Sequence, residues 1–122
     1  MTRVLRCLAL ACLMLPGAAA DAMAHAFPDH AAPAVGSTVH APPAQVRIWF
    51  TEALEPAFST IAVTDAAGKP VAKGKARLDP GNPKLLEIDL PALPPGTYHV
   101  AWRVISVDTH PTQGDFSFTV AP

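Results

Sequence analysis

The residues of this chain that are best suited to chemistry are Asp108 and His110, in the run from Ser106 to Pro111 that reads SVDTHP. In an extended segment alternate side chains project to the same side, so the carboxylate and the imidazole would face one point while Thr109 points away. Pro111 favours that geometry, because the residue before a proline is displaced from the helical region. The pair would supply half of a metal site. The alternative is an Asp that accepts a turn hydrogen bond beside a surface His.

His25 is the residue that could complete such a site. It would become the first residue of the chain if a signal peptide were removed after Ala24. Its free α-amine and its Nδ1 would then chelate one copper ion in a six-membered ring. The His110 imidazole and the Asp108 carboxylate would bring the set to three nitrogens and one oxygen, which suits tetragonal Cu(II). The alternative is a solvated His at a frayed terminus.

Residues 1–24 have the features of a cleaved secretory signal. Two arginines precede an uninterrupted apolar run over residues 7–15, and small residues follow it. The run is shorter than the roughly 20 residues that a membrane-spanning helix needs. Alanines at A-x-A spacing permit cleavage after residue 20, 22 or 24, and only the last would expose the amine of His25. We expect cleavage after residue 24 and an exported mature chain of residues 25–122.

The composition of residues 25–122 excludes several classes of function. Both cysteines and all three methionines precede residue 25, which excludes disulfides, thiolate sites and thioether sites from the mature chain. The sequence has no basic run interleaved with aromatic residues, so we expect no binding of nucleic acid. It has no second long apolar segment, so we expect no direct insertion into a membrane after signal cleavage.

Short apolar alternations make up the body of the chain, and turn residues separate them. Alternation of the kind that buries one face of a strand occurs at residues 46–50, 61–63, 86–90, 98–104 and 116–120. Proline and glycine gather in the breaks, and no segment has helical periodicity of useful length. The pattern predicts one all-β domain, an Ig-like Greek-key β-sandwich of about seven short strands. The Ala- and Pro-rich residues 31–43 are expected to form an extended lead-in.

Three motifs together resemble the CopC family, small periplasmic copper-binding proteins of bacterial copper-resistance systems. The resemblance covers essentially all of residues 25–122. The matching residues are Gly96-Thr97-Tyr98, Trp102-Arg103-Val104, Ser106 to Pro111 and Gly114, then His25-Ala26 with Pro33-Ala34 and Gly36, and finally Phe50-Thr51-Glu52. The opening departs from the family at Pro28 and Ala31, where Leu and Ser are usual.

The resemblance implies that His25, Asp108 and His110 bind one Cu(II) per mature chain. It places Glu52 close by, either as a weak ligand or, as we prefer, as an outer acceptor that orients the amine or an imidazole. It also implies a periplasmic location and delivery of copper to a CopD-like inner-membrane protein. Many family members bind Cu(I) through a methionine-rich loop, but the corresponding residues 65–73 contain no soft ligand. No Cu(I) site is therefore expected.

The leading hypothesis for function is a carrier or buffer of Cu(II) that is not an enzyme. The enzymatic alternative is a copper monooxygenase, because an N-terminal His chelate with a second His is also the site of lytic polysaccharide monooxygenases. Asp108 would occupy the equatorial position that oxygen needs, which disfavours this alternative. A third possibility is an Ig-like adhesion or assembly domain without metal. The other histidines, His30, His40 and His99, are expected to be solvated or to face outward.

Overall fold

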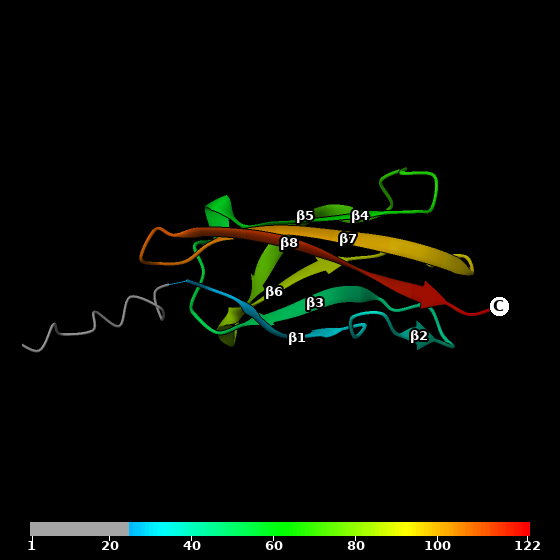
Figure 1. Ribbon diagram of the computed structural model, residues 1–122, viewed down its shortest axis with the longest axis horizontal. Coiled ribbons are helices and arrows are strands. Elements are labelled where there is room, and N and C mark those ends of the chain that lie inside the picture. Colours follow the sequence, from blue (N-terminus) through cyan, green and yellow to red (C-terminus); the bar gives the residue numbers. More distant parts are fainter. Residues whose placement is uncertain (1–24) are drawn as a thin grey trace, which may run out of the picture.

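The computed structural model describes residues 25–122, which form two four-stranded β-sheets packed face to face (Figure 1). The first sheet has the order β1-β3-β6-β5, with bounds Pro28–Ala32, Gln45–Phe50, Asn82–Asp89 and Lys73–Asp79. The second has the order β2-β8-β7-β4, with bounds Thr38–Val39, Pro111–Val120, Gly96–Ile105 and Thr60–Thr64. A 3-10 turn, η2, spans Pro56–Phe58. The arrangement confirms the predicted all-β Greek-key sandwich, with eight strands among the described residues.

The core lies between the two sheets and follows the predicted alternation. In β7 the side chains of Tyr98, Val100, Trp102 and Val104 are buried, and the residues between them are exposed. The Trp102 ring meets the Phe50 ring of the other sheet edge to face, with centroids 5.3 Å apart. Each large apolar side chain buried in this way contributes about 1.5–3 kcal/mol relative to an exposed one. The apolar residues of the alternating strands therefore form a core that does not depend on a bound ligand.

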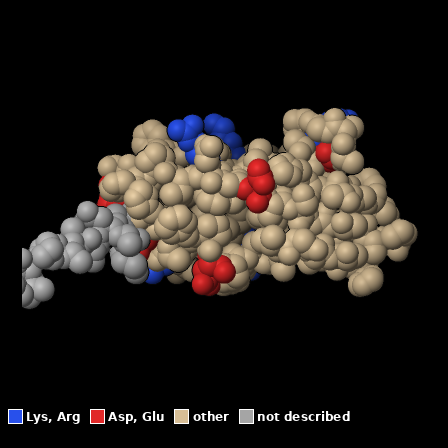
Figure 2. Space-filling model, in the orientation of Figure 1, with Lys and Arg blue, Asp and Glu red and all other residues tan. Residues whose placement is uncertain are grey.

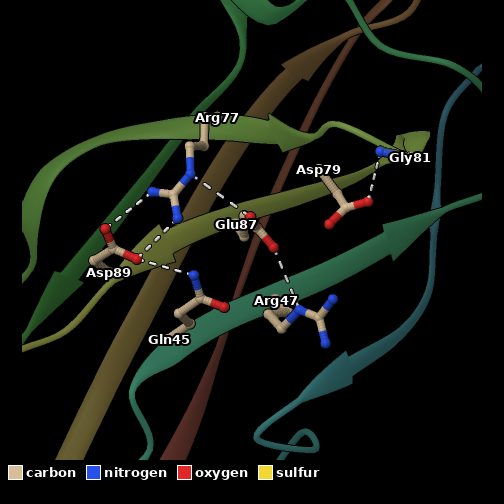
Figure 3. A network of polar contacts seen from close by, with 7 residues as sticks. All are labelled: Gln45, Arg47, Arg77, Asp79, Gly81, Glu87 and Asp89. Atoms are coloured by element: carbon tan, nitrogen blue, oxygen red, sulfur yellow. Dashed lines mark hydrogen bonds and ion pairs between the residues drawn. The ribbon is translucent and has the colours of Figure 1, made fainter.

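Strand β5 was not predicted, because its sequence KGKARLD has no apolar alternation. Its side chains instead take part in a network of polar contacts with β6 and β3 (Figure 3). Arg77 Nε lies 3.6 Å from Glu87 Oε1, and the other oxygen of Glu87 lies 3.4 Å from Arg47 Nε. Arg77 also donates two hydrogen bonds to Asp89, at 3.0 and 3.1 Å. Cross-strand ion pairs thus stabilise this strand, and they leave no hydrophobic pattern in its sequence.

The lead-in is more structured than predicted. Residues 31–43 contain the end of β1, which pairs antiparallel with β3, and all of β2, which pairs parallel with β8. This segment therefore carries the chain from one sheet to the other. Both strands lie at sheet edges and leave most of their side chains exposed or half-buried. Edge pairing of this kind depends on backbone hydrogen bonds, and so it leaves no alternation in the sequence.

One end of the sandwich brings together three segments that are far apart in the sequence. These are the start of the described chain, the residues after β3, and the loop between β7 and β8; the C-terminus lies at the opposite end (Figure 1). The Thr51 N–H donates to the Phe27 carbonyl at 2.8 Å, and the Val107 N–H donates to the Ala53 carbonyl at 3.1 Å. The residues after β3 therefore hold the other two segments in place.

The surface carries no extended basic stripe on the face that Figure 2 shows, where small groups of both signs are scattered among uncharged side chains. Within residues 25–122 no helix is long and apolar enough to cross a membrane.

Candidate metal centre

The loop that carries Asp108 and His110 is a turn, as the alternative interpretation held, and not the extended segment from which the metal site was argued. Residues 107–109 form the turn, and Thr109 has a positive φ of 73°. The Thr109 N–H donates to the Ser106 carbonyl at 2.8 Å, and the Ser106 N–H donates to the His110 carbonyl at 3.3 Å. Strands β7 and β8 are paired as far as Ile105 and Pro111. The residues between must therefore reverse the chain, which an extended segment cannot do.

The turn nevertheless brings the carboxylate and the imidazole together. Asp108 Oδ1 lies 3.5 Å from His110 Nδ1. The buried Ser106 hydroxyl donates a hydrogen bond to the same oxygen and also lies 3.4 Å from the His110 carbonyl. The hydrogen bond from Ser106 lowers the pKa of Asp108, and His110 acts in the same direction, while partial desolvation opposes both. Asp108 therefore does accept a local hydrogen bond, as the alternative interpretation proposed, and it also faces the histidine.

His25 lies against this loop. The centroids of the His25 and His110 rings are 4.6 Å apart, and the ring planes are inclined by 55°. The next residue, Ala26, is fully buried in the core. Its burial keeps His25 at this end of the sandwich. The structure therefore places His25 beside His110, and His110 beside Asp108 of the same loop.

Glu52 lies between the two segments that carry these residues. Its neighbours Thr51 and Ala53 make the backbone hydrogen bonds to Phe27 and Val107. Its side chain is half-buried, and among residues 25–122 it has no ion pair or hydrogen-bond partner. Its position agrees with a place near the site, and its role stays a prediction.

The three residues are close but are not yet arranged around a metal. Within the described part of the chain, no three side chains of His, Cys, Asp or Glu form a group that could hold an ion. The predicted amine donor is also missing from the uncleaved chain, because the nitrogen of His25 is a peptide nitrogen there. Asp108 Oδ1 is engaged by Ser106 and faces His110. The predicted signal peptide and its cleavage points, residues 1–24, lie outside the described residues.

The other histidines of the described chain have different surroundings, as expected. The His30 ring stacks on Trp49, with centroids 4.3 Å apart, and its Nδ1 lies 2.7 Å from an Asp29 oxygen. His99 is exposed on the outer face of β7, 3.4 Å from the Ser117 hydroxyl. His40 is exposed beyond β2. These contacts give none of the three a place beside His25 and His110.

Sequence reasoning missed three hydroxyl groups that form hydrogen bonds around the candidate site. They belong to Ser106, to Thr51 and to Thr112, whose hydroxyl donates to the Ala26 carbonyl at 2.7 Å. The sequence did contain a signal for Thr112. In β8 the side chains of Phe116 and Phe118 point into the core, and Thr112 lies on the same face of the strand, because it is an even number of positions before them. A hydroxyl group on the core-facing side of a strand indicates a specific hydrogen-bond partner, because a buried donor without a partner lowers stability.

Comparison with known proteins identifies the family. Residues 29–121 match the family model of the CopC domain. Copper resistance protein C of Escherichia coli is 38% identical over 117 residues, which cover 88% of this chain and 90% of that protein. The crystal structure of CopC from Methylosinus trichosporium OB3b has a TM-score of 0.72 and 39% identity, and the match covers 80% of this chain and 95% of that one.

A second solved structure resembles the chain to the same degree. PcoC, a methionine-rich copper resistance protein from Escherichia coli, has a TM-score of 0.71 and 36% identity, over 80% of this chain and 99% of that one. In contrast, all three methionines of the present chain precede residue 25. The matched part of the chain is thus similar to a methionine-rich protein but contains no methionine. On the family match and on these two folds, the chain belongs to the CopC family of copper-handling proteins.

Proposed function

We propose that this chain is exported to the periplasm, loses residues 1–24, and there acts as a carrier or buffer that holds one Cu(II). The observation that carries the proposal is the contact between His25 and His110, whose ring centroids lie 4.6 Å apart although the two residues come from opposite ends of the domain. A fold that needed only a core would have no reason to place two imidazoles and a carboxylate together on its surface.

The donors would take different roles. The His25 amine and Nδ1 form the chelate, and the His110 imidazole adds a third nitrogen, which together favour Cu(II). Asp108 supplies an anionic oxygen, and the lowered pKa of its carboxyl keeps that oxygen ionised well into the acid range. Because Ser106 engages Oδ1, Oδ2 is the oxygen that faces the metal in this proposal. Glu52 acts from outside, on the amine or on an imidazole.

The surroundings of the site favour delivery of the metal to another protein. The side chains of His110 and Asp108 are 48% and 43% exposed, so the ligands of a partner can reach the metal. Phe27 and Val107, adjacent in sequence to the site, are 52% and 56% exposed. Exposed apolar side chains beside a polar site are typical of a surface that binds a partner. We propose that the partner is a CopD-like inner-membrane copper protein.

A carrier accounts for the site better than a monooxygenase does. The relatives described above are copper resistance proteins, and the carboxylate of Asp108 competes for the position that oxygen would need. Ascorbate-driven oxidation of a polysaccharide by the copper-loaded protein is the measurement that separates the two functions. We expect no oxidation above that of free copper.

The proposal is tested by titration of the exported protein. The full chain is expressed and exported, its N-terminus is determined by mass, and Cu(II) is added in competition with a chelator of known affinity. We expect a chain that begins at His25, one Cu(II) per chain, and an electron paramagnetic resonance spectrum of nitrogen and oxygen ligands. Binding no tighter than that of the unfolded protein would overturn the proposal.

A further inference from the structure

Ala26 and Phe27 connect the two sheets at the end of the sandwich that carries the candidate site. Thr51, which follows β3 of the first sheet, binds both backbone groups of Phe27: its hydroxyl accepts from the Phe27 N–H at 3.0 Å, and its own N–H donates to the Phe27 carbonyl at 2.8 Å. Thr112, in β8 of the second sheet, donates its hydroxyl to the Ala26 carbonyl at 2.7 Å. We call Ala26, Phe27, Thr51 and Thr112 the N-terminal bridge.

The bridge lies immediately beside both histidines. Ala26 follows His25 directly, and Thr112 is two residues after His110. The hydrogen bond from the Thr112 hydroxyl to the Ala26 carbonyl therefore links the segment that follows His25 to the segment that follows His110. Ala26 is fully buried among the core residues, which leaves its carbonyl few other partners. After the proposed cleavage Ala26 and Phe27 would be the second and third residues, where chains are ordinarily poorly ordered, and here both are bonded to neighbouring strands or the residues that follow them.

We propose that Thr51 and Thr112 are positioning residues for copper, which hold the His25 chelate opposite His110 before the metal arrives. This inference rests on the proposed function and deepens it. A metal that binds an ordered terminus does not have to order it at the moment of binding, and the affinity rises accordingly. Neither threonine touches the metal. Both act through the backbone of residues 26 and 27.

The test compares threonine variants of the exported protein. Thr112→Val keeps the shape of the side chain and removes the hydroxyl, while Thr112→Ser keeps the hydroxyl. Thr119→Val is the matched control, because Thr119 lies at the other end of β8 and, within residues 25–122, its hydroxyl contacts only that of Thr97, at 3.3 Å. We expect Thr112→Val to weaken Cu(II) binding roughly 3- to 10-fold, the size of one hydrogen bond. Thr112→Ser and Thr119→Val should bind as the unsubstituted protein does.

A readout in the metal-free protein separates positioning from general stability. Nuclear Overhauser effects between the ring protons of His25 and His110 report the distance that the bridge is proposed to fix. They should weaken in Thr112→Val and return in Thr112→Ser. If Thr112→Val does not fold, Thr51→Val is measured instead, since it removes one of the two bonds to Phe27 and leaves the backbone bond in place.

The outcomes for this inference and for the proposed function are distinct. If the unsubstituted protein binds no Cu(II) but the ring contacts still depend on Thr112, the carrier function fails and the positioning stands. If Thr112→Val lowers the midpoint of thermal unfolding but leaves the ring contacts and the Cu(II) affinity unchanged, the threonine is merely structural. That result, or an equal loss of affinity in Thr119→Val, would overturn the inference.

Discussion

At the residue scale, each predicted ligand is held by a different kind of interaction. Asp108 is fixed by the Ser106 hydroxyl within its own loop. His110 is fixed by the turn, through the hydrogen bond between its carbonyl and the Ser106 N–H. His25 has no such local support, and its position depends on Ala26, the buried residue that follows it. The first two ligands are therefore set by local structure and the third by tertiary structure.

Substitution of single ligands should weaken copper binding without unfolding the protein, because the ligands lie outside the core. We expect His110→Ala to cost more affinity than Asp108→Ala, since a neutral imidazole binds Cu(II) better than one carboxylate does. Glu52→Ala should cost roughly 10- to 100-fold or less, as is typical of groups outside the ligand shell. Competition titrations measure all three. Abolished binding in Glu52→Ala together with unchanged binding in Asp108→Ala would reverse these roles.

The affinity for Cu(II) should fall between about pH 7 and pH 5, and nitrogen donors should cause the fall. Free imidazole and α-amine groups have reference pKa values of about 6.5 and about 7.7–8.0, so protons compete with the metal in this range. The pKa of Asp108 is lowered in the folded protein, so its carboxylate stays ionised there, and its contribution is lost only as the pH falls through that lowered pKa. Asp108→Asn should therefore bind more weakly with the same pH slope. A flat profile would contradict nitrogen ligation.

At the scale of the elements, alternation of apolar residues predicted the strands that have one buried face. Strands β7 and β8 extend over the predicted residues because Tyr98, Val100, Phe116 and Phe118 report their burial directly. Strands β1, β2 and β5 were not predicted, since they lie at sheet edges and are held by backbone pairing or ion pairs. Such contacts depend on what the neighbouring strand offers, which one segment of sequence does not contain.

The site was predictable in its members but not in its geometry. His25, Asp108 and His110 were found from residue type and from family motifs, and the structure places His110 beside each of the other two. The turn was only the alternative interpretation, because the metal site was argued from an extended segment that Pro111 favours, whereas the pairing of β7 with β8 decides the shape of the loop. Thr112 was missed because its partner lies at the other end of the chain.

Gly114 in β8 is required by the packing of the neighbouring strand. A Cβ at this position would lie 2.5 Å from Cζ2 and 2.9 Å from Cε2 of the Trp102 ring. Trp102 is a large core side chain that is also in contact with Phe50, so it cannot move freely. We expect Gly114→Ala to lower the free energy of unfolding by about 1–3 kcal/mol, as overpacking of a core does.

Chemical denaturation measures this effect, with Gly81→Ala as the control. A Cβ at Gly81 would meet only the end of the Asp79 side chain, at 3.3 Å, which is free to rotate away. Equal stabilities of the two variants would show that Trp102 does not fill the space above Gly114.

At the scale of the whole molecule, the core and the candidate site are separate. The buried residues lie between the sheets, while the candidate ligands lie at one end, on a loop and at the first described residue. Apolar packing holds the two sheets together, and the cross-strand ion pairs of the first sheet involve none of the candidate ligands. The metal-free protein should therefore be folded, which the proposed carrier function requires because a carrier alternates between loaded and empty states.

The whole mature chain should discriminate between the two oxidation states of copper. Residues 25–122 contain no cysteine and no methionine, so a soft site for Cu(I) cannot be assembled from any part of them. We expect Cu(I) to remain with a soft chelator in a competition assay under conditions in which Cu(II) is bound. A tight Cu(I) site in the mature protein would show that nitrogen and oxygen ligands alone suffice for that ion.

The central claim is that the free amine of His25 is a copper ligand, and one measurement tests it most directly. Cu(II) affinity is compared between the chain that begins at His25 and a chain with one additional residue before it, which converts the amine into a peptide nitrogen. Thermal unfolding of the two should be the same, because Ala26 and the strands are unchanged. We predict that the extended chain loses most of its affinity. Equal affinity with the same spectroscopic signature of the ligands would contradict the account.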